Sequence, residues 1–102
     1  MSNKEELFDN IRLGNSEAVE NLLESNPKLL ESKDQRGSTP LLLAAYYGHE
    51  NVVEFLLEKG ATVDALDGSG NTALMGVCFK GYTDIAKKLI DAGANVSQKN
   101  AM

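Results

Sequence analysis

The sequence is short of the residues that build metal clusters and disulfide frameworks. Its 102 residues include one cysteine, one histidine, two prolines and no tryptophan. A single cysteine cannot form an internal disulfide, and no group of potential ligands has the spacing of a metal site. The longest unbroken apolar run covers residues 41–47, far short of the ~20 residues that span a bilayer. We therefore expect neither a bound metal nor a membrane-spanning segment.

The chain also lacks a surplus of positive charge. Its formal net charge is −5 at pH 7, and residues 1–33, 34–66 and 67–102 carry net charges of −3, −3 and +1. Affinity for nucleic acids and anionic membranes comes largely from clustered Lys and Arg, so neither partner is expected. The polar N-terminus shows no signal-peptide pattern, which predicts a cytoplasmic protein.

Two segments of the chain repeat each other. Residues 34–66 align with residues 67–99 at a constant offset of 33. The identical pairs are Asp34/Asp67, Gly37/Gly70, Thr39/Thr72, Leu41/Leu74, Gly48/Gly81, Leu56/Leu89, Gly60/Gly93, Ala61/Ala94 and Val63/Val96. Glycines that recur in register with an apolar pattern are typical of a repeat architecture.

A third and more degenerate copy precedes these two. Residues 14–24 align with residues 48–58 at an offset of 34, and one extra residue enters before Asp34. We expect this first copy, about residues 4–33, to act as an end cap, because one of its faces must meet water instead of another repeat.

Each full copy carries the signals of two helices separated by a glycine. Thr39 is suited to cap a helix N-terminus, and Pro40 suits the first helical position. Gly48 is expected to end this helix. A second helix is predicted over residues 50–59, with one apolar stripe and with Gly60 as its stop. Neither helix can bury its apolar side alone, so the units must stack.

The segments "GSTPLLLAAYYGH" and "VVEFLLEKGATVDA", which belong to a unit that recurs after 33 residues, resemble the ankyrin repeat. The resemblance covers nearly the whole chain and implies an all-α solenoid of stacked helix-turn-helix units with protruding hairpin loops. It implies one domain over residues 1–102, with repeats at about 4–33, at 34–66 and at 67–99. Residues 100–102 then begin a truncated further repeat. In the last repeat Ala73 replaces the family's proline. Gly76, Val77 and Cys78 replace the family's usual Leu-Ala-Ala, which predicts slightly different helix packing there.

No residues are arranged for catalysis. Cys78 aligns with Ala45, so we expect a small buried packing position and not a nucleophile. His49 follows the inter-helix glycine and is expected to have a structural role in that turn. The segment "DGSGNT", residues 67–72, lacks the lysine of a phosphate loop and the ligand spacing of a calcium loop, so we interpret it as a hairpin turn. The sequence predicts no cofactor and no enzymatic activity.

The repeat register brings aromatic and basic residues together. The aligned triplets are Arg12, Tyr46 and Phe79, and Leu13, Tyr47 and Lys80. The ankyrin resemblance implies that these positions, at the end of each first helix, face a concave groove where partners dock. Helices pack about 8–10 Å apart, so aromatic side chains of neighbouring repeats are expected nearly to touch there. The alternative is that Tyr46 and Phe79 pack against their own hairpins.

The loops supply the second half of the expected surface. The resemblance marks variable, partner-facing hairpin positions at Gln35, Arg36, Ser38, Ser69 and Asn71. Together with the two triplets they form the candidate binding surface, which contains the aromatic and arginine residues that are enriched in interface hot spots.

Two functions stay open at this point. The first is a non-catalytic protein–protein interaction module that presents its groove and hairpin loops to a protein partner of unknown identity. The second is an architectural role, in which a fragment of a longer ankyrin array associates with itself through the uncapped end of residues 67–99 while the groove is idle. Groove substitutions are expected to abolish binding in the first case, and self-association that depends on concentration is expected in the second.

Overall fold

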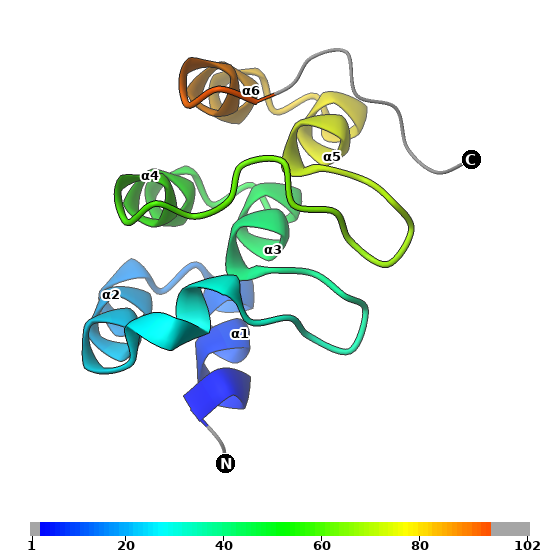
Figure 1. The fold of residues 1–102 in the computed structure, drawn as a ribbon. Helices are drawn as coiled ribbons and strands as arrows, with labels where there is room; N and C mark the ends of the chain where they lie inside the picture. Colours follow the sequence, from blue (N-terminus) through cyan, green and yellow to red (C-terminus); the bar gives the residue numbers. More distant parts are fainter. Residues whose placement is uncertain (1–2, 95–102) are drawn as a thin grey trace.

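The computed structural model describes residues 3–94, which form three helix pairs (Figure 1). The first pair is α1 (Asn3–Leu13) and α2 (Ser16–Ser25), the second is α3 (Pro40–Tyr46) and α4 (Glu50–Glu58), and the third is α5 (Ala73–Lys80) and α6 (Thr83–Asp91). A short 3₁₀ helix, η1 (Pro27–Glu31), follows the first pair. The described residues contain no strand, so the expected all-α class is confirmed.

Some of the sequence lies outside this description. Residues 95–99 of the expected third repeat, and residues 100–102 beyond it, are not among the described residues. Within residues 3–94, no helix has the length and apolar content needed to cross a membrane.

The helix pairs stack in one direction. Helix α3, the first helix of the second pair, packs against α1 on one side and against α5 on the other. The second helices α2, α4 and α6 lie side by side in an outer layer (Figure 1). The loops that precede α3 and α5 both project from the opposite side of the stack (Figure 1). This arrangement leaves one long inner surface, made of first helices and loops.

The same cap begins the first helix in both full repeats. Thr39 Oγ1 accepts a hydrogen bond from the Leu42 amide at 3.3 Å. Thr72 Oγ1 accepts the equivalent bond from the Met75 amide, also at 3.3 Å. The predicted cap at Thr39 is therefore confirmed, and it is kept in the last repeat, where Ala73 replaces the proline. Each cap satisfies an amide that has no partner within its own helix, which is worth about 1 kcal/mol.

A ring from each turn packs on the turn before it. A Cβ added at Gly14 would lie 2.6 Å from the His49 ring, and one added at Gly48 would lie 3.0 Å from the Tyr82 ring. His49 and Tyr82 occupy equivalent repeat positions. The His49 Nε2 atom also lies 2.9 Å from the Arg12 carbonyl oxygen. The structural role expected for His49 is therefore confirmed.

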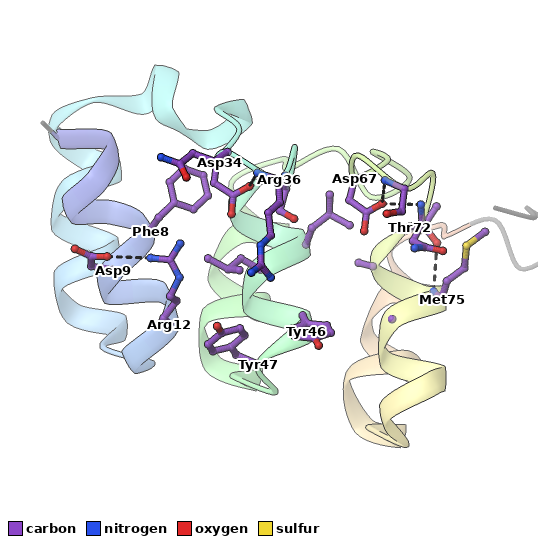
Figure 2. A pocket seen from close by; sticks show the side chains of 18 of the residues that line it. Phe8, Asp9, Arg12, Asp34, Arg36, Tyr46, Tyr47, Asp67, Thr72 and Met75 are labelled. Carbon is purple, nitrogen blue, oxygen red and sulfur yellow. Dashed lines mark hydrogen bonds and ion pairs between the residues drawn. The ribbon is translucent and has the colours of Figure 1, made fainter. Parts of the chain in front are cut away.

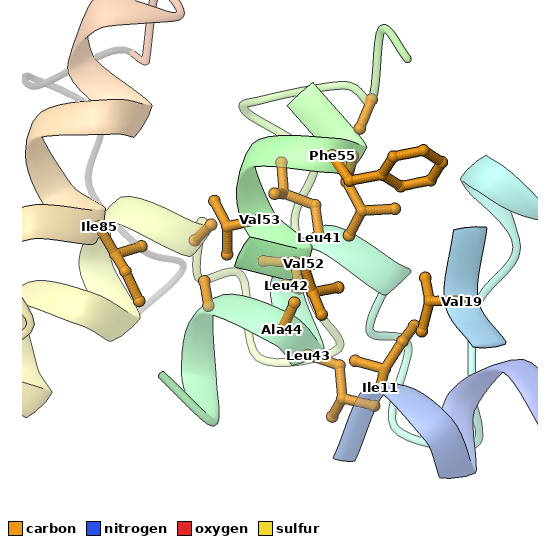
Figure 3. Close-up of a cluster of buried hydrophobic side chains, with 14 of the residues drawn as sticks. Ile11, Val19, Leu41, Leu42, Leu43, Ala44, Val52, Val53, Phe55 and Ile85 are labelled. Atoms are coloured by element: carbon orange, nitrogen blue, oxygen red, sulfur yellow. The ribbon is translucent and has the colours of Figure 1, made fainter. Parts of the chain in front are cut away.

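The core is one continuous apolar cluster between the two helix layers (Figure 3). Its most deeply buried side chains are Leu7, Ile11, Val19, Leu41, Val52, Val53, Leu56, Val77 and Leu89. The small Ala44 and Ala45 of α3 are also fully buried, which lets neighbouring helices approach closely. Burying one Leu or Val side chain contributes about 1.5–3 kcal/mol, so the cluster provides most of the driving force for stacking.

The expectation for Cys78 is wrong. The aligned Ala45 is fully buried, but Cys78 is exposed. Ala45 lies on α3, which has first helices on both sides. Among the described residues, α5 packs against a first helix on one side only. Equivalent repeat positions therefore have different environments, because Cys78 lies at the end of the described stack.

The extra residue of the first repeat is accommodated in η1. Pro27 begins this 3₁₀ helix, whose Leu29 and Leu30 pack against the core. Its last residue, Glu31, accepts hydrogen bonds at Oε2 from the Thr62 amide at 2.8 Å and from the Thr62 hydroxyl at 3.1 Å. The insertion was predicted, but the helix was not. Through the bonds of Glu31, η1 ties the first helix pair to the loop that follows the second helix pair.

We expect Gly37→Ala to destabilise the fold more than Gly81→Ala. The two glycines have φ angles of 80° and 78°, so both substitutions incur similar backbone strain of about 1–2 kcal/mol. A Cβ at Gly37 would also lie 2.9 Å from the Gly68 amide nitrogen, whereas one at Gly81 meets no described atom within 4 Å. The free energy of unfolding should therefore fall further for Gly37→Ala than for Gly81→Ala, by about 1 kcal/mol or more. Urea denaturation followed by circular dichroism measures both, and equal losses would contradict a close contact between the hairpins.

Candidate protein-binding surface

A groove of about 1500 Å³ runs along the inner side of the stack. It is lined by side chains of α1, α3 and α5 and by two hairpin loops, residues 34–38 and 67–71 (Figure 2). Its walls come from segments that are far apart in the sequence. An elongated partner lying in this groove would therefore contact all three helix pairs at once.

Most of the candidate surface residues line this groove. They are Arg12, Gln35, Arg36, Ser38, Tyr46, Tyr47, Ser69, Asn71 and Phe79. Leu13 and Lys80 do not line it. Leu13 is exposed at the end of α1. Lys80 reaches the edge of the groove through Tyr46, because its Nζ atom lies 4.4 Å from the centroid of the Tyr46 ring.

The aromatic residues do not form the expected contact across the groove. Tyr46 and Tyr47 are 49% and 43% exposed, and their ring centroids lie 5.7 Å apart. Phe79 is 89% exposed, which leaves little of its surface to touch Tyr46. The expectation that these two rings nearly touch is therefore wrong, and Lys80 takes that place on the Tyr46 ring. The result is an aromatic surface that faces solvent (Figure 2).

Sequence reasoning missed the floor of the groove. Phe8, Leu42 and Met75 occupy equivalent repeat positions, and all three line it. Phe8 and Leu42 are buried and Met75 is half-buried, so together they form an apolar base. Each lies four residues before a member of the first aligned triplet, on the same face of its helix. That spacing was the signal that could have found them.

The rim of the groove is held by the same hydrogen bonds in both hairpins. Asp34 Oδ1 accepts hydrogen bonds from the amides of Arg36 and Ser38, each at 2.9 Å. Asp67 Oδ1 accepts from the amides two and four residues later, at 2.8 and 2.9 Å. The interpretation of residues 67–72 as a hairpin turn is therefore confirmed. In each hairpin an aspartate carboxylate organises the backbone, which is the usual role of this residue in turns.

The two hairpins are also joined to each other. The Gly68 amide donates to the Arg36 carbonyl oxygen at 3.1 Å, and Lys33 Nζ donates to the Leu66 carbonyl oxygen at 3.5 Å. A Cβ at Gly68 would lie 2.6 Å from the same Arg36 oxygen. The absence of a side chain at Gly68 thus allows the two hairpin backbones to approach closely. The rim is consequently a fixed surface and not a pair of independent loops.

Arg12 is fixed at the edge of the groove by two contacts. Its Nη1 atom lies 2.9 Å from Asp9 Oδ1. Both side chains are largely exposed, so this ion pair contributes at most about 1 kcal/mol. The Arg12 carbonyl oxygen accepts the hydrogen bond from the His49 ring, which requires that Nε2 carry the proton. The charge of Arg12 is therefore already balanced by a carboxylate within the chain.

The outer side of the stack carries a separate group of charges. Lys88 Nζ on α6 lies 2.8 Å from Glu54 Oε1 and 3.4 Å from Glu50 Oε2 on α4. The hydrogen bond to Glu54 raises the pKa of Lys88 above its ordinary value. Because the pKa of Lys88 is raised in the folded chain, the stabilisation from its contacts with the two glutamates is present at neutral pH. It is lost only as the pH rises through the folded-state pKa in the alkaline range.

In the part of the chain that the structure describes, no group of three His, Cys, Asp or Glu side chains could hold a metal.

Residues 7–100 match the sequence model of a family described as ankyrin repeats, in three copies. The chain belongs to the ankyrin-repeat family. Ankyrin repeats are in general non-catalytic modules for protein–protein interaction.

Similar curated proteins are much longer than this ankyrin-repeat chain. BTB/POZ domain-containing protein 3 of Schizosaccharomyces pombe is 45% identical over 56 residues, which cover 55% of this chain and 11% of that protein. Oxysterol-binding protein-related protein 1 of Homo sapiens is 40% identical over 72 residues, 62% of this chain and 8% of that protein. Ankyrin repeat and SAM domain-containing protein 6 of Mus musculus is 35% identical over 59 residues, 58% of this chain and 7% of that protein. The chain therefore spans only a small part of the length of these relatives.

The hairpins of the ankyrin repeats provide a prediction about Asp34. Asp34→Ala removes the acceptor of two amide hydrogen bonds and should lower the free energy of unfolding by about 1–2 kcal/mol. Asp34→Asn keeps an oxygen at the same place and should lower it by less than half as much. Urea denaturation of the two variants measures the difference. If Asn were as destabilising as Ala, the negative charge of Asp34 and not its amide hydrogen bonds would hold the hairpin.

Proposed function

We propose that this chain acts by binding a protein partner in its concave groove. The observation that carries the proposal is the exposed pair Tyr46 and Tyr47 in the middle of the groove, above an apolar floor. Tyrosine offers a large contact area with little conformational entropy to lose, and for this reason it is frequent in binding hot spots.

The construction of the rim supports the same proposal. The hairpin backbones are fixed by Asp34, by Asp67 and by the bond from Gly68 to Arg36. A preorganised surface loses less entropy when a partner binds, so more of the contact energy appears as affinity. The exposed thiol of Cys78 is consistent with a reducing compartment, and we propose that the chain acts in the cytoplasm.

Groove substitutions should weaken binding strongly while the fold stays intact. We expect Tyr46→Ala/Phe79→Ala to lose a partner that the wild-type chain retains from an extract of the source cells. Titration of that purified partner should show binding weakened about tenfold or more, since hot-spot truncations commonly cost over 1 kcal/mol each. Circular dichroism should show unchanged helicity, because both side chains are substantially exposed.

Ile90→Ala is the matched control for this experiment. Ile90 is a 47% exposed apolar residue of α6 that does not line the groove. The Ile90→Ala variant should retain the partner as well as the wild-type chain does. A partner that the groove variant holds normally, or that only Ile90→Ala loses, would refute groove binding.

A second candidate function is association through the last helix pair. Cys78 is exposed where the aligned Ala45 is buried, and Ile90 is 47% exposed at the position of the half-buried Leu57. Apolar positions that other repeats cover are thus uncovered at this end of the described stack. An exposed apolar face of this kind favours contact with another repeat unit.

Sedimentation velocity tests this second candidate. The average mass should rise with concentration for the wild-type chain, and Ile90→Glu should restore a monomer by placing a charge in the contact. Leu13→Glu, which alters an exposed leucine of α1, should leave the association unchanged. A chain that stays monomeric at all concentrations would rule out self-association through this face.

A further inference from the structure

The positive charges in the groove are not all balanced. Arg36 is exposed, and no described carboxylate lies within ion-pair distance of its guanidinium. Its backbone is fixed, since its amide donates to Asp34 and its carbonyl accepts from Gly68. Figure 2 shows its side chain descending from the hairpin into the groove, in front of α3 and above the two tyrosines. The structure therefore holds a free guanidinium over an aromatic surface.

Four acidic residues line the groove, Glu5, Asp9, Asp34 and Asp67, together with three basic ones, Lys4, Arg12 and Arg36. The Asp34 and Asp67 carboxylates are half-buried, and each accepts two backbone hydrogen bonds. Asp9 is paired with Arg12 at 2.9 Å. Arg36 is therefore the cation beside the tyrosines that has no carboxylate partner among the described residues.

A second cation lies against the ring of Tyr46. Lys80 Nζ is 4.4 Å from the centroid of the Tyr46 ring, a cation–π contact that leaves the ammonium accessible. Arg36 comes from the hairpin before α3 and Lys80 from the end of α5, so two repeats each bring a cation to the region of the tyrosines. An anionic group bound there would be attracted by both.

Two of the three helices in the outer layer are strongly acidic. Glu17, Glu20 and Glu24 lie on α2, and Glu50, Glu54 and Glu58 lie on α4. Neither helix contains a lysine or an arginine. In a chain of net charge −5, an acidic ligand would be repelled from these two helices. The charge distribution thus favours the groove over α2 and α4 for such a ligand.

We propose that the groove recognises an acidic segment of a partner protein, in which an Asp or Glu lies next to an aromatic or aliphatic residue. The carboxylate pairs with the Arg36 guanidinium, whose planar fork of donors fits a carboxylate in two-point contact. The neighbouring apolar side chain lies against Tyr46 and Tyr47, with the floor at Leu42 beneath. This inference rests on groove binding as the function of the chain, and it adds the chemistry of the occupant.

Selection from a phage-displayed library of random peptides tests the occupant directly. Peptides retained by the wild-type chain should be enriched in Asp or Glu beside an aromatic or aliphatic residue. A fluorescent synthetic copy of an enriched peptide should bind about three- to fivefold more weakly to Arg36→Gln, the range expected for an exposed ion pair. Its affinity should also fall between ~50 mM and ~500 mM NaCl, because salt screens such pairs.

Two further variants separate the charge of Arg36 from its structural role. Arg36→Lys keeps the charge and should bind more tightly than Arg36→Gln. Lys87→Gln removes an exposed charge from α6 outside the groove and should bind as the wild-type chain does. All three variants keep the backbone hydrogen bonds of the hairpins, so their thermal unfolding should match that of the wild type.

The outcomes distinguish the two proposals. Enriched peptides that are neutral or basic, or that lose no more affinity with Arg36→Gln than with Lys87→Gln, would overturn the acidic occupant. If those peptides still required Tyr46, groove binding itself would stand. A selection that yields no peptide dependent on Tyr46 would reject both the groove and its occupant.

Discussion

The stacking of each helix pair on the next is the interaction on which the rest of the structure depends. No pair can cover its own apolar surface, and α3 is buried only because α1 and α5 lie on its two sides. Stability in such an array is approximately a sum of contributions from each unit and from its contacts with neighbours. The groove is a product of this stacking, since it exists only where successive first helices and hairpins line up. Binding and folding therefore rely on the same register of repeats.

Much of the fold and of the binding surface could be predicted from the repeat pattern, and the errors have one cause. The caps at Thr39 and Thr72, the turn at Gly48 and the hairpin at residues 67–72 follow from local sequence, so they were predictable. Cys78 was misjudged because its environment depends on what lies beyond it in the stack. The groove floor could have been found from helix periodicity added to the alignment, whereas the Lys80–Tyr46 contact depends on side-chain direction, which neither gives. Alignment thus gives equivalent positions but not their neighbours.

The surface separates what holds its shape from what it presents. The hairpin geometry is maintained by carboxylate-to-amide bonds from Asp34 and Asp67 and by the bare backbone of Gly68. The side chains that face the groove, such as Arg36 and Ser69, contribute to this geometry only through their backbone atoms. They can change without loss of the hairpin, because loops on a rigid scaffold tolerate variation. A constant framework can in this way present many different chemical surfaces.

The ring contacts between turns give the array a direction. His49 packs on Gly14 and Tyr82 packs on Gly48, so the first two turns each offer a bare glycine to the pair that follows, and the second and third turns each offer a ring to the pair that precedes. Gly81 is the equivalent glycine of the third turn, and no described atom lies within 4 Å of the place its Cβ would occupy. The contact is heterologous: two copies that met by their third turns would place glycine against glycine, with no ring between them. A further unit that continues the pattern must therefore approach head-to-tail, with a ring that fits the open position at Gly81.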